Sequence, residues 1–340
     1  MAGTMKAAVI TNFNKPIEVK QVPIPKIKHD EVLVKMEYTG MCGTDHHVWK
    51  GELPAELPRI PGHEGIGKVV EVAANVEHVK VGDEVGIPWL HDACGDCEYC
   101  YSGWETLCQH QHNAGFTCDG TMAEYAVADP KYCARIPKGV NKAKLAPVLC
   151  AGLTVYKGLK QTDAKAGNWV MITGLGGLGQ LGVQYAKAMG FNVVGVDIDD
   201  GKLESAKKLG ATYTFNGMTQ DVPKLVQEAT GGVHGILVTA VSRSAFGQAL
   251  GGLRPRGTMV LIGLPSGDFP LNIVNTVLNA KTIRGSIVGT RMDMIEALEF
   301  FKEGKIQNEI QLDTLDNAWE KMQLMDAGKL PNRIVYDFTK

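Results

Sequence analysis

Residues 169–190, WVMITGLGGLGQLGVQYAKAMG, decide the fold class of this chain. The apolar run WVMIT precedes Gly174, Gly176 and Gly179 in the pattern GxGxxG, and a helical pattern follows them. The pattern alone is a weak signal in a chain with 40 glycines, but its place between a strand and a helix is specific. It predicts a turn that binds a dinucleotide pyrophosphate at a helix N-terminus, the alternative being a Gly-rich turn in another α/β protein.

The next apolar run, VVGVD, ends in Asp197, 18 residues after Gly179. A carboxylate at the end of this second strand can accept hydrogen bonds from the hydroxyls of the adenosine ribose. It would also repel a 2′-phosphate. The sequence therefore favours NAD over NADP.

Apolar runs continue to alternate with helical patterns through 151–288. Right-handed crossovers between such runs produce a parallel sheet covered on both faces. We therefore expect an α/β domain with a doubly wound, six-stranded parallel sheet. The expected strands are WVMIT, VVGVD, TYTFN, GILVTA, TMVLIG and TIRGSIVG, and the expected helices are LGQLGVQYAKAMG, KLESAKKLG, DVPKLVQEATG and SAFGQALGGL.

The chain before this domain has a different rhythm. Short strand-like runs cut by Gly, Pro and Asp, such as KAAVI, EVLVKMEY and AEYAVA, predict a mostly β domain. After Thr290, MIEALEFFKEGKI and LDNAWEKMQLMDAG read as amphipathic helices that return to this first domain. We expect one domain from 1–150 with 289–340, and a second from 151–288.

Composition narrows the class of protein. A net charge of −2 without a basic block argues against nucleic acid or an anionic membrane as partner. No apolar run approaches the roughly 20 residues of a membrane span. Eight cysteines without a secretory signal favour a reducing compartment, and we expect a cytoplasmic protein. Met5 offers a second start, so residues 1–4 are treated as a possible extension.

Four cysteines, Cys94, Cys97, Cys100 and Cys108, lie within one short stretch. Four thiolates close a tetrahedral zinc shell, so this lobe, 94–108, is predicted to hold a structural metal and no substrate. An iron–sulfur cluster is the alternative, but the spacing fits ferredoxin patterns poorly. Disulfides are not expected in a reducing compartment.

A second set of metal-ligating residue types is dispersed along the chain. MCGTDHHVW, PGHEGIG and VLCAGLTVY supply Cys42, His63, Glu64 and Cys150. Spacing alone does not select them, because a single cysteine is often a small core residue and a single histidine often a structural hydrogen-bond partner.

Several segments together resemble the zinc-containing medium-chain alcohol dehydrogenases, over nearly the whole chain and closest to the yeast and bacterial ethanol-active branch. The resemblance implies a GroES-like catalytic domain, zinc and NAD as cofactors, and a homotetramer built from dimers. The segments are MCGTDHHVW, PGHEGIG, VGIPWLHDACGDCEYCYSGWETLC, NAGFTCDGTMAEY, VLCAGLTVYKGL, GLGGLG and GSIVGTR.

The resemblance also assigns roles at the dispersed set. Cys42, His63 and Cys150 would be the catalytic zinc ligands, an arrangement known from alcohol dehydrogenases that leaves a fourth position open. Glu64 matches a carboxylate that can approach the zinc. Asp45 would orient His63.

Further residues match the proton path and the substrate pocket. Thr44 would take the alcohol proton, and His47 would pass it to solvent. Leu53 stands where the yeast-type enzymes have a pocket-narrowing tryptophan, whereas Trp89 keeps a second pocket position. Gly43 departs from the family pattern, which removes a pyrophosphate contact.

The cofactor contacts implied by the resemblance lie mostly in the Gly-rich domain. One of them, a pyrophosphate contact, lies near the C-terminus. They are Gly174, Gly176, Gly177, Leu178, Gly179, Asp197, Lys202, Thr154, Val241 and Arg333. The four crowded cysteines match the structural zinc, which makes two zincs per subunit.

The expected activity is reversible hydride transfer between a primary or secondary alcohol and NAD. A secondary-alcohol, polyol or carbonyl reductase on the same scaffold is an alternative. A zinc-stabilised nucleotide-sensing module is a third, but the segment EYCYSGWE around the cysteines is acidic. Cys118 and Cys133 are interpreted as packing residues or inert thiols.

Overall fold

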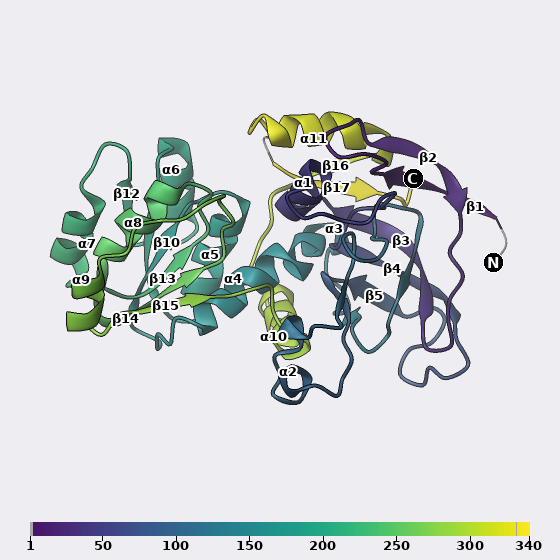
Figure 1. Ribbon diagram of the computed structural model, residues 1–340, viewed down its shortest axis with the longest axis horizontal. Helices are drawn as coiled ribbons and strands as arrows, with labels where there is room; N and C mark the ends of the chain where they lie inside the picture. Colours follow the sequence, from purple (N-terminus) through teal and green to yellow (C-terminus); the bar gives the residue numbers. More distant parts are fainter. Residues whose placement is uncertain (1–2, 331) are drawn as a thin grey trace. The chain divides into compact units, whose positions relative to one another are not determined.

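The computed structural model describes residues 3–330 and 332–340 of the chain (Figure 1). Met1, Ala2 and Pro331 lie outside the described residues, and so does part of the possible extension at 1–4. The chain forms two compact units. The first runs up to Cys150 and includes Thr290–Glu299 and Asn308–Lys340, and the second contains Ala151–Gly289 and Phe300–Gln307. This division groups Phe300–Gln307 with the second unit.

The second unit contains a six-stranded, entirely parallel sheet. Its strand order is β12-β11-β10-β13-β14-β15, so the first strand lies in the centre and the order reverses there. This is the doubly wound dinucleotide topology, and the predicted fold class is confirmed. The strands are β10 (Trp169–Thr173), β11 (Asn192–Asp197), β12 (Tyr213–Asn216), β13 (Val233–Val238), β14 (Leu253–Leu261) and β15 (Thr282–Gly285).

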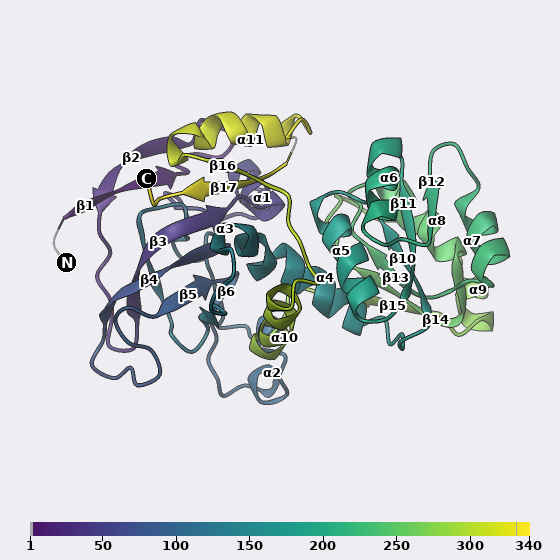
Figure 2. The same cartoon turned by 180° about the vertical axis from the view of Figure 1, so that it is seen from behind.

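Helices lie on both sides of this sheet (Figures 1 and 2). Strand β10 is apolar almost throughout because both of its faces are buried, and Val170, Met171 and Ile172 have no exposed surface. Helices α7 and α8 pack on one face through a core that includes Val226 and Phe246. The helices are α4 (Ala151–Lys160), α5 (Gly177–Ala188), α6 (Asp200–Lys208), α7 (Val222–Thr230), α8 (Arg243–Gly251) and α9 (Ile273–Leu278).

The first unit is mostly β, as its short runs predict. Its main sheet has the order β16-β17-β3-β4-β5-β9, with β8 paired to β3, and two small two-stranded sheets accompany it. The strands are β1 (Thr4–Val9), β2 (Glu18–Pro23), β3 (Val32–Gly40), β4 (Gly65–Val72), β5 (Glu84–Ile87), β6 (Leu90–Asp92), β7 (His112–Asn113), β8 (Tyr125–Ala128), β9 (Ala134–Arg135), β16 (Ile310–Asp313) and β17 (Arg333–Asp337).

The helices of this unit are short apart from the two after Thr290, which the sequence predicts as amphipathic. They are α1 (Gly43–Lys50), α2 (Glu98–Tyr101), α3 (Lys142–Leu145), α10 (Arg291–Lys302, whose last residues fall in the second unit) and α11 (Ala318–Asp326). Strands β3 and β4 are antiparallel, with Thr39 opposite Gly65. The segment after β3 and the segment before β4 therefore lie at the same end of the sheet.

A buried carboxylate ties the cysteine-rich lobe to the start of α10. Glu105 is almost fully buried and accepts hydrogen bonds from the backbone nitrogen, Nε and a terminal nitrogen of Arg291, at 2.9, 2.9 and 3.0 Å. The Arg291 guanidinium also lies over the ring of Tyr132, 4.5 Å from its centroid. Because Glu105 lies between Cys100 and Cys108, this contact anchors the lobe to the rest of its unit.

Replacing Glu105 with Ala should destabilise the first unit by about 1–3 kcal/mol, because charge-assisted hydrogen bonds to a buried acceptor are lost. Arg291 is half exposed, and water will satisfy part of its hydrogen-bonding capacity. Urea unfolding, monitored by hydrogen exchange in peptides of the first unit, measures the change in the free energy of unfolding. The exposed Glu77→Ala variant is the control and should stay within about 0.5 kcal/mol of the parent. A Glu105→Ala protein as stable as the control would contradict this role.

Candidate metal and cofactor sites

One buried carboxylate organises the dispersed set of candidate residues. Asp45, in the first turn of α1, accepts hydrogen bonds from the backbone nitrogens of Cys42 at 2.8 Å and Gly62 at 3.0 Å. Its Oδ1 atom also lies 3.3 Å from Nδ1 of His63. The segment after β3 is thereby fastened to the segment before β4, and the His63 ring is held by its Nδ1 edge.

The structure brings Cys42, His63, Glu64 and Cys150 together. Their ligand atoms all lie within 4.8 Å of one another, and all four residues are buried. The sulfur atoms of Cys42 and Cys150 are 3.7 Å apart, close to the roughly 3.8 Å between two thiolates on one tetrahedral zinc. His63 is only 1% exposed, and its buried Nε2 has no hydrogen-bond partner among the described residues. A bound metal ion would satisfy this orphaned nitrogen, so the donor set fits zinc.

Glu64 is the fourth member of this cluster. Its carboxylate is fully buried, and it pairs with the guanidinium of Arg333 from β17. Oε2 of Glu64 has no hydrogen-bond partner. A Cβ atom at Gly40 would lie only 2.0 Å from that oxygen, so a glycine at the end of β3 provides the space that Glu64 occupies.

The protonation of the cluster follows from burial and proximity. Burial raises the pKa of Glu64 to about 8, although the Arg333 guanidinium opposes the shift. The hydrogen bond from Cys150 holds the pKa of the Cys42 thiol well below its ordinary value. The same bond, together with burial, raises the pKa of Cys150. The Cys42 thiol therefore loses its proton more readily than the Cys150 thiol.

His63 behaves differently from an isolated buried imidazole. Burial alone would lower the pKa of His63, but the charges of Asp45 and Cys42 outweigh it and raise that pKa well above its ordinary value. A cation on Nε2 would take the place of this proton, as metal binding to histidine requires.

The candidate proton-path residues lie on α1, next to the cluster. Oγ1 of Thr44 is 3.7 Å from Sγ of Cys42, and Thr44 lies inside the helix, whose N-cap residue is Cys42. His47 lies one turn further along α1, and its Nδ1 is 2.5 Å from a carboxylate oxygen of Glu52. His46 instead contacts Asp326 of α11.

The candidate pocket residues have different surroundings. The ring of Trp89 meets the His63 ring edge to face, with centroids 5.2 Å apart, and stacks on Phe116 at 5.8 Å. Leu53 is half-buried and packs on the core that contains Trp49. Trp89 therefore adjoins the metal cluster directly.

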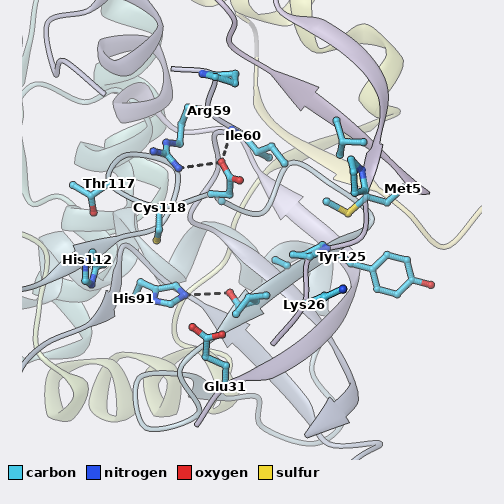
Figure 3. Close-up of a pocket in the computed structure, with 18 of the residues that line it drawn as sticks. Met5, Lys26, Glu31, Arg59, Ile60, His91, His112, Thr117, Cys118 and Tyr125 are labelled. Carbon is cyan, nitrogen blue, oxygen red and sulfur yellow. Dashed lines mark hydrogen bonds and ion pairs between the residues drawn. The ribbon is translucent and has the colours of Figure 1, made fainter. Parts of the chain in front are cut away.

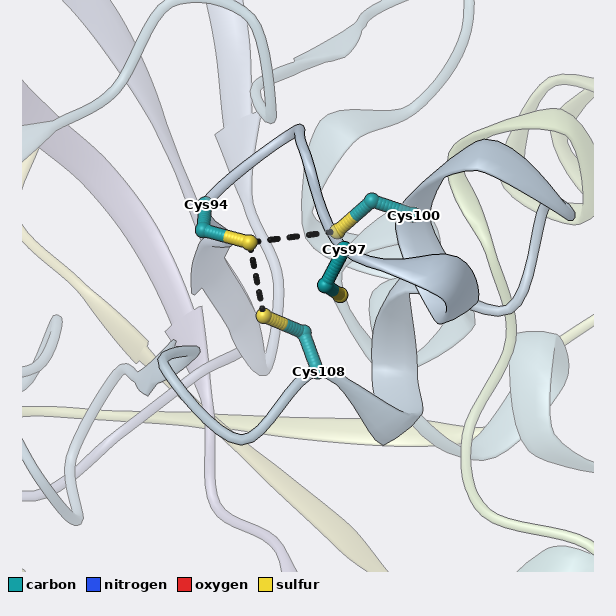
Figure 4. A group of neighbouring side chains, drawn as sticks. All are labelled: Cys94, Cys97, Cys100 and Cys108. Carbon is teal, nitrogen blue, oxygen red and sulfur yellow. Dashed lines mark hydrogen bonds between the residues drawn. The ribbon is translucent and has the colours of Figure 1, made fainter.

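Cys94, Cys97, Cys100 and Cys108 converge in the lobe around α2 (Figure 4). The sulfur of Cys94 lies 3.5 Å from that of Cys108 and 4.0 Å from that of Cys100. Cys97 is the N-cap residue of α2, and the backbone N–H of Cys100 lowers its pKa to about 7. Four sulfurs at these spacings fit a closed tetrahedral zinc shell.

The Gly-rich turn has the geometry that a pyrophosphate needs. Gly174 has a φ of 91°, and a Cβ there would lie 2.6 Å from the backbone nitrogen of Ala240. A Cβ at Gly179 would lie 1.8 Å from the carbonyl oxygen of Gly174, so helix and turn touch there. A Cβ at Gly176 would meet nothing within 4 Å, which leaves the N-terminus of α5 open to a ligand.

Asp197 closes the turn from the end of β11. Its carboxylate accepts hydrogen bonds from the backbone nitrogens of Leu175 at 2.6 Å and Ile198 at 2.8 Å, and Nζ of Lys202 lies 4.0 Å away. Among the other candidate contacts, Gly177 and Leu178 begin α5, Val241 is exposed, and Thr154 is buried in α4.

A separate cavity of about 570 Å³ lies in the first unit, between the β1–β2 hairpin and the loop that contains Cys118 (Figure 3). None of the four residues of the dispersed metal set lines it. Arg59 is paired there with Asp119, and His91 and His112 both contact Asp92. Burial raises the pKa of the Cys118 thiol to about 12, as it does for Cys133, which agrees with unreactive thiols.

Sequence reasoning missed three residues around the site. Gly40 carries no motif of its own, and its importance depends on the later position of Glu64. Phe116 follows the Gly115 turn, and only the fold brings it onto Trp89. Glu52 lies five residues after His47 and just beyond Gly51, the residue that ends α1. A glycine at a helix end reverses the chain, and this is the signal in the sequence that could have predicted the contact.

Similarity to known proteins agrees with this geometry. Residues 28–138 match the family described as "Alcohol dehydrogenase GroES-like domain", and residues 177–303 match "Zinc-binding dehydrogenase". An alcohol dehydrogenase of Moraxella sp. (strain TAE123) is 51% identical over 337 residues, which cover 98% of this chain and 100% of that protein.

Solved structures share the complete fold. A crystal structure named NAD-dependent alcohol dehydrogenase superimposes with a TM-score of 0.90 at 27% identity, covering 98% of this chain and 99% of that one. Acetophenone reductase from Geotrichum candidum, in complex with NAD, gives 0.88 at 28% identity, with 98% and 97% covered. With both of its domains matched and a relative identical at half of its positions, the chain belongs to the zinc-containing medium-chain alcohol dehydrogenases and is an NAD-dependent alcohol dehydrogenase.

Proposed function

We propose that Cys42, His63 and Cys150 hold the catalytic zinc of this enzyme. The observation that carries the proposal is the buried, unpartnered Nε2 of His63, which faces two thiols 3.7 Å apart. Three protein ligands leave a fourth position for the alcohol oxygen. Glu64 is a further carboxylate that can approach the zinc, and Asp45 orients His63 through Nδ1.

Zinc held by these residues would supply Lewis acidity toward the alcohol oxygen, and NAD held at the Gly-rich turn would supply the hydride acceptor. The residues of the chain handle the proton. Thr44, whose Oγ1 adjoins the Cys42 sulfur, receives it from the alcohol. His47, one turn further along α1, delivers it to solvent, because its imidazole is partly exposed.

We also propose a second zinc on Cys94, Cys97, Cys100 and Cys108, which gives two per subunit. The closed set of four sulfurs leaves no position for a substrate, so this ion acts on stability. The hydrogen bonds between Glu105 and Arg291 join the lobe to α10, so a lobe ordered by zinc would also stabilise the start of that helix.

Replacing Cys42 with Ser should remove one zinc per chain and reduce turnover by more than about 100-fold, because a hydroxyl does not replace a thiolate ligand. The protein should keep its fold and its affinity for NAD. Replacing Cys97 with Ser should also remove one zinc, but with a lower melting temperature. Metal analysis and initial rates check both results, with Cys118→Ser as the control. Full turnover by the Cys42→Ser protein would refute the assignment.

The cofactor site uses the turn before α5. We propose that Gly174, Gly176, Gly177, Leu178 and Gly179 hold the pyrophosphate, and that Asp197 and Lys202 bind the adenosine ribose. The open space at Gly176 and the clustered backbone nitrogens around Asp197 support this proposal. Thr154 and Val241 are proposed to contact the nicotinamide half, and Arg333 the pyrophosphate.

Replacing Asp197 with Ser should lower the preference for NAD over NADP by about 10- to 100-fold, since a charge-assisted acceptor is lost and the repulsion of a 2′-phosphate disappears. The ratio of kcat/KM for the two cofactors measures this preference. Asp268→Ser, an exposed carboxylate of the same unit, is the control and should keep the parent ratio. An unchanged ratio in Asp197→Ser would rule out the proposed role.

The substrate range follows from the two pocket residues. Trp89 adjoins His63 and narrows the space near the metal. Leu53 is smaller than the tryptophan that yeast-type enzymes carry there, so we propose primary and secondary alcohols, including some larger than ethanol. The activity of a secondary-alcohol or carbonyl reductase is the second candidate. Initial rates with matched primary and secondary alcohols would separate the two.

We propose that the enzyme is a cytoplasmic homo-oligomer, a tetramer built from dimers in the pattern of its family. None of the eight cysteines forms a disulfide, which suits a reducing compartment. Among the described residues, no helix has both the length and the apolar character needed to cross a membrane.

Helix α9 exposes Ile273, Val274, Val277 and Leu278 by 66–79% each. It belongs to the same unit as β15, the last strand of its sheet, and such exposed apolar surface supports contact with a second copy.

Replacing Val277 and Leu278 together with Asp should shift the protein to a smaller species, because two charges would be buried in the proposed contact. Light scattering coupled to size-exclusion chromatography measures the mass. Val81→Asp, at an exposed valine of the first unit, should leave the mass unchanged. A double variant of parental mass would exclude α9 from the contact.

A further inference from the structure

His47 has a carboxylate partner that no motif assigns. Nδ1 of His47 lies 2.5 Å from Oε2 of Glu52, whereas Nε2 of the same ring has no hydrogen-bond partner among the described residues. The His47 side chain is 24% exposed and that of Glu52 is 55% exposed. The contact therefore lies at the rim of the site, where a proton leaves for solvent.

The end of α1 creates this contact. Gly51 follows the helix with a φ of 76°, a left-handed conformation that glycine adopts without strain. The chain reverses there, and the backbone nitrogens of Glu52 and Leu53 donate to the carbonyl oxygen of His47 at 3.0 and 3.2 Å. Backbone hydrogen bonds thus place the Glu52 side chain beside the His47 ring, so the contact does not depend on a freely rotating surface residue.

The chemistry of Glu52 determines which ring nitrogen of His47 carries the proton. The hydrogen bond from His47 lowers the pKa of Glu52 below its ordinary value, so this carboxylate stays ionised at neutral pH. An ionised carboxylate only accepts hydrogen bonds, and Nδ1 must therefore donate. In the neutral imidazole, Nε2 then carries the lone pair and can accept a proton.

We propose that Glu52 is a positioning residue for the proton path: it holds His47 by Nδ1 and keeps Nε2 as the base that faces the reaction. This inference rests on the proposed role of His47 in moving the proton. The arrangement is the same one by which a carboxylate orients a catalytic histidine in other enzymes, with Glu52 supplied here by the C-terminal turn of the helix that carries His47.

Other charged groups near His47 do not substitute for Glu52. The ring of His46 lies edge to face with that of His47, with centroids 6.1 Å apart, but His46 is hydrogen-bonded to Asp326. Lys50 also pairs with Asp326, at 2.7 Å. Glu52 is therefore the only carboxylate hydrogen-bonded to His47 among the described residues.

The test compares Glu52→Ala, which removes the acceptor, with Glu52→Gln, which keeps an oxygen acceptor without the charge. Glu52→Ala should lower kcat for alcohol oxidation by about 3- to 10-fold at low pH, the size expected for one net hydrogen bond. The loss should shrink at high pH, where base in the solvent takes the proton directly. The KM values for alcohol and NAD should stay close to those of the parent, and Glu52→Gln should recover part of the rate.

His47→Gln provides the second arm of the test. If Glu52 acts through His47, adding Glu52→Ala to His47→Gln should cause no further loss. Glu56→Ala, an exposed carboxylate of the same loop, is the control and should match the parent at every pH.

The outcomes separate the two proposals. A loss in His47→Gln that Glu52→Ala does not reproduce overturns the role of Glu52 and leaves the proton path in place. An equal loss from Glu52→Ala with and without His47 also overturns it, because Glu52 would then act independently. The absence of any pH-dependent loss in His47→Gln would overturn the proton path itself, and the positioning role with it.

Discussion

The buried carboxylate of Asp45 is the contact on which the cluster of Cys42, His63, Glu64 and Cys150 depends. Asp45 is 1% exposed, and its two oxygens accept hydrogen bonds from the backbone nitrogens of Cys42 and Gly62. One of them, Oδ1, also lies 3.3 Å from Nδ1 of His63. A buried charge is tolerated only when it is paired or hydrogen-bonded on all sides. Asp45 therefore fixes the backbone of two segments and one ring orientation together. The unpartnered Nε2 of His63 is directed at the thiols as a consequence.

The two cysteine-rich sites differ because different parts of the fold bring their sulfurs together. The four sulfurs of the lobe come from 15 consecutive residues around α2, so a local loop suffices to close the shell. Cys42, His63 and Cys150 come from three distant segments, and the antiparallel pairing of β3 with β4, together with the contacts of Asp45, brings the first two together. With zinc bound as we propose, the four sulfurs of the local site would leave no free position, whereas the three ligands of the dispersed site would leave one for a reactant.

Patterns of neighbouring residues in the sequence accordingly predict those parts of the fold that contacts between neighbouring residues determine. The Gly-rich turn, the six parallel strands and the two helices after Thr290 could be identified from periodicity and spacing, since each depends on neighbouring residues. The pairs Arg333 with Glu64 and Arg291 with Glu105 could not, because each joins segments more than 180 residues apart. Helix α9 was not predicted for another reason. Its apolar residues are exposed, so its sequence lacks the helical periodicity of residues that face a core.

The directions of the pKa shifts explain why the dispersed cluster suits a divalent cation. Two buried thiols 3.7 Å apart cannot both ionise on their own, and the pKa of Cys42 falls while that of Cys150 rises. Burial raises the pKa of Glu64 to about 8, and the guanidinium of Arg333 is paired with it. A doubly charged ion would balance two thiolates, with Glu64 protonated or paired with Arg333. The space that Gly40 leaves beside Glu64 lets this carboxylate remain in the cluster without a steric conflict.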